Sequence, residues 1–578
     1  MSAVPLSARP LWRMQPQPDP DAVRALQGGL GLPSALCRLL AARGHRTIGE
    51  ARSFLRPMLG SLHDPAGLTD ADRAARRLAR AVAQREMVVV HGDYDVDGIS
   101  GAALLAAWIR ALGGRAGAIV PDRLEHGYDL SSPGVDRAAA RGAAVLVTVD
   151  CGIVALDPVR RAVASGMDVI VTDHHQPGPE LPPALAVVNP NRPDCAYRNK
   201  HLCGAGVAFK VGQLLAAALG RPQEEGWQYL DLVALATIAD QVELAGENRV
   251  LARYGLRALT QTTRPGLAAL IRRAGLGPDP GNPLDSAAVA FQLGPRINAA
   301  GRVGDPTAAL RLLLTDDRAE AGRLAETLET SNRERRSVEE RTTAEALEAL
   351  RDEYEPSRDR AVVVAGDDWH PGVIGIVASR LVERICRPVV VVAFDGDRGR
   401  GSARSIPSFD LHAAIAACAG HLERFGGHHQ AAGLDIERDR LSAFREAFCS
   451  LARRTLGGAE PRPELRADLE LGLNEVGPDL CRYLRHVGPF GRGNPEPVFI
   501  ARRVHLAAPK VLKGNHLKFR MARNGASLGA IGFRLADRVP PVQALMKGPV
   551  DVAFNLMENT FRGHTTIEAK TLDIRPSP

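Results

Sequence analysis

Acidic and imidazole side chains gather where apolar, β-rich runs of the sequence end. The run MVVV leads into HGDYDVDG (residues 91–98), and AAVLVTV leads into Asp150. A third run, MDVIVT, leads into Asp173, His174 and His175. The sequence therefore places ionisable side chains at three successive predicted strand ends.

The types and spacing of these side chains suit a divalent metal ion. In an extended segment alternate side chains face the same way, so His91, Asp93, Asp95 and Asp97 can converge. Three carboxylates in one loop repel one another unless cations neutralise them, and hard divalent ions favour carboxylate and imidazole ligands. A further acid, Asp240, follows the apolar run LDLVALATIA, where a lone carboxylate is costly to bury. An isolated acidic loop is more often a solvated turn and a His pair can simply end a strand, but coincidence at three strand ends favours a metal site.

The elements that must position these residues follow from the hydrophobic pattern. From Met87, β-rich runs alternate with alanine-rich helical runs, which predicts a parallel sheet with helices on both faces and its site at the carboxyl ends of the strands. A charged stretch with no Pro until Pro356 and with Gly322 as its one Gly predicts a long helix, and later β-rich runs predict a smaller α/β domain and a small β-barrel. The predicted domains are a helical segment at 1–80, the larger α/β domain at 81–315, the linker helix at 316–357, the smaller α/β domain at 358–456 and the barrel at 457–578.

The composition is that of a multidomain globular protein. Hydrophobic residues make up 45% and charged residues 24% of the 578 residues. No apolar run approaches the roughly 18 to 20 residues that span a bilayer, and the amino terminus lacks the features of a secretory signal, so we expect a cytoplasmic protein without membrane contact. The eight cysteines form no CxxC pair, which argues against a zinc ribbon or redox motif. The net charge of +7 permits a polyanionic ligand.

Taken in order, four of these motifs resemble those of a known superfamily. HGDYDVDG, VTVDCG, TDHH and ATIAD are similar to the motifs of the DHH phosphoesterases. Downstream, GPRINAAGR, GSARSIPSFDL, GGHHQAAGL and PFGRGNPEPVF resemble the RecJ-type single-stranded-DNA exonucleases of that superfamily, over about residues 30–540. The resemblance implies a parallel-sheet DHH domain, a smaller DHH-associated substrate-binding domain joined to it by the long helix, and a C-terminal OB-like nucleic-acid-binding barrel.

The resemblance also implies two divalent metal ions, manganese or magnesium. One ion would be held by His91, Asp95 and Asp150, and the other by Asp97, Asp150, His174 and Asp240, with Asp150 as the bridge. Among the catalytic residues, His175 would contact the scissile phosphate, while Asp93 and Asp173 would orient the ligands. Two such ions can activate water and stabilise the departing oxygen of a phosphodiester.

Substrate contacts are expected from residues outside the metal motifs. By resemblance, Arg123, Ser402 and Arg404 would recognise a terminal 5′-phosphate, for which guanidinium groups are suited. The path of the DNA strand is expected to be lined by Arg296, Asn298 and Arg302. The motif GGHHQAAG would contact the substrate through Gly427, His428 and His429. From composition alone, the arginines near Arg404 are equally typical of a solvated basic loop.

The predicted barrel carries a one-sided basic stripe. Residues 501–524 contain no Asp or Glu and include Arg502, Arg503, Lys510, Lys513, Lys518, Arg520 and Arg523. Such a stripe across β-hairpins suits a module that tracks a phosphate backbone, although a solvated strand face is the alternative.

The function implied is that of a 5′-to-3′ exonuclease that degrades single-stranded DNA to 5′-mononucleotides in recombination and repair. Single-stranded DNA is the expected partner, with a single-strand-binding protein and a RecQ-like helicase as further partners. Two alternatives are a phosphoesterase for nanoRNA or dinucleotides and a catalytically silent DNA-binding scaffold. The sequence departs from the family pattern at Cys151, where Asn is usual, and this removes none of the expected ligands.

Overall fold

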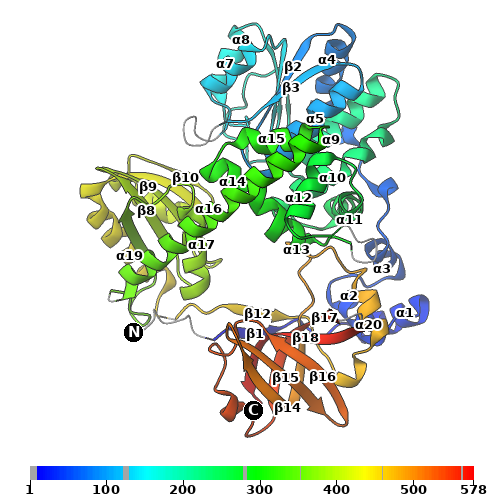
Figure 1. Ribbon diagram of the computed structural model, residues 1–578, viewed down its shortest axis with the longest axis vertical. Coiled ribbons are helices and arrows are strands. Elements are labelled where there is room, and N and C mark those ends of the chain that lie inside the picture. The colour runs from blue at the N-terminus through cyan, green and yellow to red at the C-terminus, as the bar shows by residue number, and fades with distance from the viewer. Residues whose placement is uncertain are drawn as a thin grey trace. The chain divides into compact units, whose positions relative to one another are not determined.

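The computed structural model describes residues 9–121, 129–277, 283–351, 353–458, 460–561 and 564–577. Internal contacts divide the chain into two compact units. One unit comprises the described residues up to Met14 together with Arg333–Arg466, and the other comprises Gln15–Asn332 together with the chain from Ala467 onward. Figure 1 shows the elements of both units, which are described in turn.

A five-stranded parallel sheet forms the centre of the larger unit. Its order is β3 (Arg115–Ile119), β2 (Met87–Gly92), β4 (Val145–Val149), β5 (Asp168–Thr172) and β6 (Ala186–Val188). The apolar core on one face includes α4 (Ala71–Ala83), α5 (Val96–Ala111) and α9 (Gly204–Ala218), and that on the other includes α7 (Ser132–Ala140) and α8 (Leu156–Ala164) (Figure 1). Both faces are buried, which explains the valine-rich strands and confirms the predicted fold of this domain.

Further helices continue the core beyond the sheet. They are α10 (Leu230–Ala239), α11 (Gly246–Thr260), α12 (Pro265–Arg273), the π-helix η4 (Val289–Leu293), α14 (Gly294–Val303) and α15 (Pro306–Leu314). The 34-residue helix α16 (Arg318–Arg351) runs through the predicted linker. The long helix between the two α/β domains is thus confirmed.

The smaller unit is built on a mixed sheet with the order β10 (Arg424–Gly427), β11 (Ala431–Glu437), β9 (Arg398–Arg404), β8 (Val389–Asp395) and β7 (Val362–Asp367). Only β7 and β8 are parallel. The helices of this unit include α17 (Ile374–Ile385), α18 (Leu411–Ala417) and α19 (Leu441–Leu456), and α18 and α19 share an apolar core with the sheet. This is the predicted smaller α/β domain.

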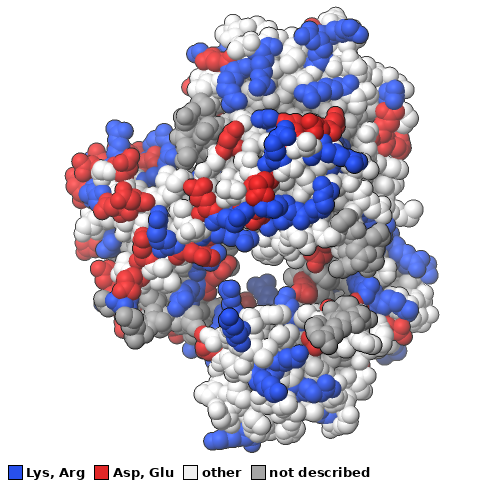
Figure 2. All heavy atoms as spheres, in the orientation of Figure 1, with Lys and Arg blue, Asp and Glu red and all other residues white. Residues whose placement is uncertain are grey.

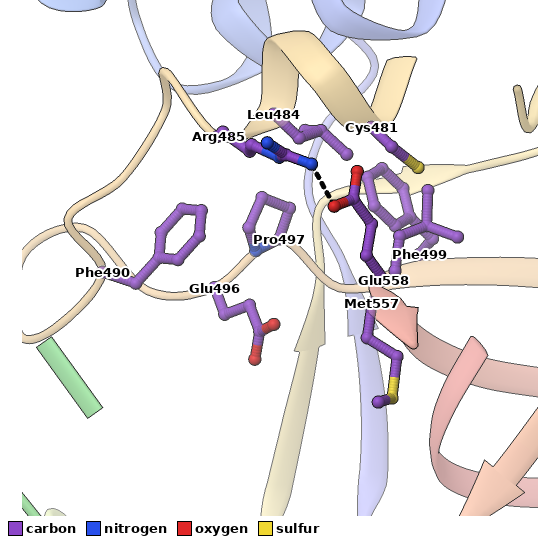
Figure 3. A pocket seen from close by; sticks show the side chains of 10 residues that line it. Cys481, Leu484, Arg485, Phe490, Glu496, Pro497, Phe499, Met557 and Glu558 are labelled. Carbon is purple, nitrogen blue, oxygen red and sulfur yellow. Dashed lines mark hydrogen bonds and ion pairs between the residues drawn. The ribbon is translucent and has the colours of Figure 1, made fainter. Parts of the chain in front are cut away.

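The C-terminal strands close into a barrel. The order β14 (Phe499–Leu512), β15 (His516–Arg523), β16 (Ala526–Gly532), β18 (His564–Pro576) and β17 (Val550–Phe561) is closed by pairing of β14 with β17. The predicted barrel is confirmed. Beside it, α20 (Pro478–Leu484) borders a largely apolar pocket lined by Leu484, Phe490, Phe499 and Met557, next to an ion pair between Arg485 and Glu558 (Figure 3).

The segment predicted at 1–80 is divided between different cores. Helices α1 (Pro20–Leu30), α2 (Ser34–Ala42) and α3 (Ile48–Leu55) share a core with the barrel, whereas α4 belongs to the parallel-sheet domain. An amphipathic pattern predicts that a helix buries one face but does not identify the surface that covers it. Among the described helices, none combines the length and hydropathy needed to cross a membrane.

Candidate metal centre and substrate contacts

The candidate metal ligands meet at the carboxyl edge of the parallel sheet. Strand β4 lies between β2 and β5, so Asp150, which follows β4, is central. The acids of the 91–98 loop follow β2 on one side, and residues 173–175 follow β5 on the other. Asp240 arrives from a different direction, as the residue that ends α10. Neighbouring parallel strands thus bring together residues up to 82 positions apart, from Asp93 to His175.

Three groups of potential ligands form among the described residues, and within each group the ligand atoms lie within 4.8 Å of one another. They are Asp93, Asp95 and Asp150; Asp97, His174 and Asp240; and Asp150, His174 and His175. Asp150 and His174 each belong to two groups, so the three form one continuous site. His174 Nε2 lies 3.0 Å from Asp150 Oδ1, 3.7 Å from Asp240 Oδ2 and 3.8 Å from Asp97 Oδ2.

Several atoms of this site are buried without a hydrogen-bond partner among the described residues. They are Asp93 Oδ1, Asp150 Oδ1, His174 Nε2 and, on β2, His91 Nε2; the close approach of His174 Nε2 to Asp150 Oδ1 is not a hydrogen bond. Burial, followed by the charges of neighbouring carboxylates, raises the pKa of Asp93, Asp150 and Asp240 well above its usual range. Buried unsatisfied polar atoms are costly, and a cation among them removes that cost. A donor set of carboxylates and imidazole therefore fits a hard divalent ion such as Mn²⁺ or Mg²⁺.

Helix N-termini hold two of the acids in place. Asp95 caps α5 by accepting hydrogen bonds from the backbone N–H groups of Asp97 and Gly98. Asp97 accepts from the backbone N–H groups of Gly204 and Ala205 at the start of α9, at 2.6 and 2.7 Å. A Cβ at Gly204 would lie 2.5 Å from the Cβ of Asp150, so this close approach requires glycine.

Asp173 orients the two histidines rather than joining a ligand group. Its Oδ1 accepts hydrogen bonds from the backbone N–H groups of His174 and His175 and lies 2.8 Å from His175 Nδ1. Its Oδ2 accepts from the N–H of Ile153, in the loop after Asp150. Burial alone would lower the pKa of His175, but the bond to Asp173 raises it to about 9. The bond to Asp173 thus orients the ring of His175 and favours its protonated form, which is suited to contact with a phosphate.

His91 belongs to none of the three groups. Strand β2 ends at Gly92, so the alternation expected from His91 to Asp97 does not continue through the loop. His91 lies within the strand, its Nδ1 is 3.7 Å from Cys151 Sγ, and a Cβ on Gly134 of α7 would lie 2.7 Å from its Nε2. Burial lowers the pKa of His91 to about 4, so the ring is neutral. Its role as a ligand stays a prediction.

Further residues support the site and had not been predicted. Asn189 and Asn191 donate hydrogen bonds to the carbonyl oxygens of His175 and His174. Asp129 accepts from the N–H of Gly152 at 2.6 Å, and burial raises the pKa of Asp129 to about 6. The run VVNPNRPD, in which polar residues follow β6 at a fourth strand end, is a signal that could have identified the two asparagines.

Helix α14 braces the metal loop with residues that were expected to line the strand's path. Asn298 Oδ1 accepts a hydrogen bond from the backbone N–H of Val96, between Asp95 and Asp97, at 3.0 Å. Arg296 is buried, and its guanidinium donates to Glu329 and to the carbonyl oxygen of Gln292. Arg302 lies in the last turn of the same helix. Direct substrate contact by these three residues stays a prediction.

The remaining predicted substrate residues lie in the smaller unit, except Arg123, which is outside the described residues. Ser402 and Arg404 are on β9, and Arg404 donates a hydrogen bond to Ser402 Oγ. Gly427 ends β10, and His428 and His429 lie in the exposed turn between β10 and β11. Strand β11 pairs with β9 so that Ala431 is opposite Arg404. These five residues are therefore at one end of one sheet.

The basic residues of the barrel fall into two classes. Arg502 pairs with Glu470 and Asp551, and Arg523 donates to the carbonyl oxygen of Arg502. Lys510, Lys518 and Arg520 are exposed as well; Lys510 is directly opposite Lys518 on the neighbouring strand, and Arg520 donates a hydrogen bond to Ser527 Oγ. We call these last three residues the barrel cations. Figure 2 shows Lys and Arg gathered over the lower, barrel part of the view.

Comparisons with known proteins agree with this architecture. Residues 87–237 match the DHH family N-terminal domain, residues 359–454 match the DHHA1 domain, and residues 467–573 match the RecJ OB domain. The chain is 37% identical over 561 residues to the single-stranded-DNA-specific exonuclease RecJ of Dickeya dadantii, covering 93% of this chain and 95% of the relative.

Solved structures give the same result. RecJ from Thermus thermophilus in complex with Mn²⁺ aligns with a TM-score of 0.84 and 33% identity, over 98% of this chain and 80% of that one. The same protein in complex with Mg²⁺ aligns with a TM-score of 0.78 and 32% identity, over 98% and 78%. Similarity of this extent covers the parallel sheet, the smaller α/β domain and the barrel together. The chain therefore belongs to the RecJ family of single-stranded-DNA-specific exonucleases.

Proposed function

We propose that this protein is a metal-dependent exodeoxyribonuclease that degrades single-stranded DNA from its 5′ end and releases 5′-mononucleotides, in recombination and repair. The observation that carries the proposal is the cluster of buried, unpartnered carboxylate and imidazole atoms at three strand ends. The barrel and the family membership over nearly the whole chain favour this function over hydrolysis of a dinucleotide or nanoRNA. The presence of every expected metal-ligand residue favours it over a silent scaffold.

The proposed cofactors are two divalent ions, manganese or magnesium. When bound, they would supply Lewis acidity that activates water and stabilises the leaving oxygen of a phosphodiester. Asp95, Asp97, Asp150, His174 and Asp240 would hold them, with Asp150 between the groups. Asp93 joins these residues in the proposal because its carboxylate lies with those of Asp95 and Asp150.

The other residues of the site are proposed to bind the phosphates of the substrate or to orient neighbouring side chains and loops. His175, oriented by Asp173, would donate a hydrogen bond to a phosphate oxygen. Asp173 fixes the ring of His175 and ties the loop after Asp150 to the loop after β5. In the smaller unit, Ser402, Arg404 and the turn with His428 and His429 would bind the 5′-phosphate, together with Arg123.

The proposed macromolecular partner is single-stranded DNA. The barrel cations would follow its phosphate backbone, since exposed cations on a barrel face gain binding energy by releasing counterions from a polyanion. We further propose that the protein is cytoplasmic. We also propose two protein partners: a single-strand-binding protein that covers the same DNA, and a RecQ-like helicase that supplies the single strand.

The proposed activity can be tested with end-labelled substrates. Long single-stranded DNA, duplex DNA and a dinucleotide, each labelled at either end, are incubated with the protein and Mn²⁺. We expect rapid release of the 5′-terminal nucleotide from the single strand and little from the duplex. Asp150→Asn should abolish release, whereas Asp157→Asn, which alters an exposed acid on α8, should not. Preferential hydrolysis of the dinucleotide, or internal cleavage first, would contradict the proposal.

The proposed ligand set can be tested by metal binding without catalysis. Calorimetric titration with Mn²⁺ compares Asp93→Asn with His91→Gln, both buried and both at the end of β2. Asp93→Asn should weaken Mn²⁺ binding at least about tenfold, and His91→Gln should weaken it less. The opposite order would assign His91 to the metal and return Asp93 to an orienting role.

A further inference from the structure

An aromatic side chain is exposed close to the metal centre. Phe291 has 73% of its surface accessible, and no other large apolar side chain among the described residues is more exposed. Single exposed apolar residues are common and need no explanation by themselves. Phe291 differs from such residues in its backbone conformation and in its location.

Phe291 is at the middle of the π-helix η4. The backbone N–H of Gly294 donates to the carbonyl oxygen of Val289, five residues earlier. Arg296 then fixes this wide turn, because its Nη1 donates to the carbonyl oxygen of Gln292 at 2.7 Å while its Nε is anchored by Glu329 at 2.7 Å. Short π-helical turns are rare and occur frequently at functional sites. The chain therefore uses a buried ion pair to hold the turn that exposes Phe291.

The same turn abuts the metal centre. A Cβ on Gly294 would lie 3.4 Å from the Cβ of Ala239 and 3.9 Å from the side chain of Val96. Ala239 precedes Asp240, and Val96 lies between Asp95 and Asp97. Phe291 lies three residues, less than one helical turn, before Gly294, which packs against residues that flank three candidate ligands.

We propose that the ring of Phe291 stacks on a nucleobase of the single-stranded DNA, at one fixed position near the scissile phosphate. This rests on the proposed function. The metal centre offers carboxylates and imidazoles, which hold phosphate and metal but give a base no apolar surface. An exposed ring provides that surface for any base, because every base has a π-face, and so it positions the strand without selecting its sequence.

The test combines a protein variant with an altered substrate. Strands carrying a single abasic site at successive positions from the 5′ end are compared in wild type and Phe291→Ala. In wild type, the abasic site should raise KM about tenfold at one position only. Phe291→Ala should raise KM for the intact strand by a similar factor, and the abasic site at that position should then have no further effect, because both changes remove the same contact.

Controls separate stacking from a structural role. Phe291→Trp keeps a stacking surface and should restore KM, and in an Asp150→Asn background its fluorescence should be quenched by single-stranded DNA. Trp227→Ala alters another exposed aromatic, at the opposite end of α10 from Asp240, and should leave the abasic profile unchanged.

The outcomes distinguish this inference from the proposed function. Failure of wild type to release nucleotides from the intact strand would refute the exonuclease assignment. Normal release with the same abasic profile in wild type and Phe291→Ala would overturn the stacking contact alone. Loss of activity in Phe291→Ala that is equal for every strand, or a similar change in profile in Trp227→Ala, would also overturn it.

Discussion

Helix α14 and the outer face of the barrel both carry basic or polar residues that suggested DNA contact, but the structure places them differently. In α14, Arg296 and Asn298 face inward and make hydrogen bonds to Glu329, Gln292 and Val96. On the barrel, Lys510 and Lys518 face outward, and like charges lie opposite each other. The comparison teaches that basic and polar residues of similar appearance in the sequence can be bonded within the protein or left exposed, and that only the exposed ones are available to a ligand.

The largest expected effect is on stability, from Arg296→Met. The side chains of Arg296 and Glu329 are 9% and 14% exposed, so removing the guanidinium takes a short ion pair away from a largely buried carboxylate. The free energy of unfolding should fall by about 3 kcal/mol, measured by denaturant titration. The double variant Arg296→Met/Glu329→Leu should recover most of this loss. Unchanged stability combined with weaker DNA binding would place Arg296 among the substrate contacts.

A smaller effect is expected from Asn298→Ala. The backbone N–H of Val96 loses its acceptor, and the loop that carries Asp95 and Asp97 is less well held. Binding of Mn²⁺ should weaken about tenfold, as for other residues that orient metal ligands, while DNA binding without metal should not change. Asn298→Asp keeps an oxygen acceptor and should lose less. A raised KM for DNA with normal Mn²⁺ affinity would instead indicate that Asn298 contacts the DNA, as proposed for the barrel cations, and does not hold the metal loop.

Neutralising the barrel cations should affect binding and not stability. In Lys510→Gln/Lys518→Gln/Arg520→Gln, the slope of log affinity against log salt should become less steep by about 2, because each lost phosphate contact on a single strand contributes about 0.7. Arg502→Gln is the matched control on the same barrel, since Arg502 is paired with Glu470 and Asp551. A change of slope in the control of about one third of that in the triple variant would show that net charge, not the outer face, decides binding.

The smallest effect is a gain in stability. Because Lys510 lies opposite Lys518, Lys510→Ala should raise the free energy of unfolding by roughly 0.5 kcal/mol at low salt. High salt should remove the gain by screening. Lys513→Ala, in the turn beyond the paired positions, should not change stability. A destabilised Lys510→Ala protein would show that the side chain packs against the barrel.

The sequence predicted the structure best where acidic or imidazole residues coincide with the end of a hydrophobic run. Strand-end acids in valine-rich runs predicted the sheet, its active edge and the convergence of Asp97, Asp150 and His174, because parallel strands end at the same edge. The role of His91 as a ligand stays a prediction; its Nε2 is buried without a hydrogen-bond partner among the described residues. The sequence could not predict that Arg296 is buried, since the partner Glu329 is 33 residues away on another helix. Sequence patterns gave no indication of the π-helical turn or of the shared core of α1–α3 with the barrel.

The pairing of β14 with β17 closes the barrel and so limits how neighbouring copies of the protein can associate. A protein that binds a long polyanion through an exposed face gathers many copies along one strand, at a local concentration far above that in bulk. An open sheet edge at that face would allow neighbouring copies to add strands to one another and aggregate. In the five-stranded barrel each strand is paired on both sides over part of its length, which shortens the edge open to such additions.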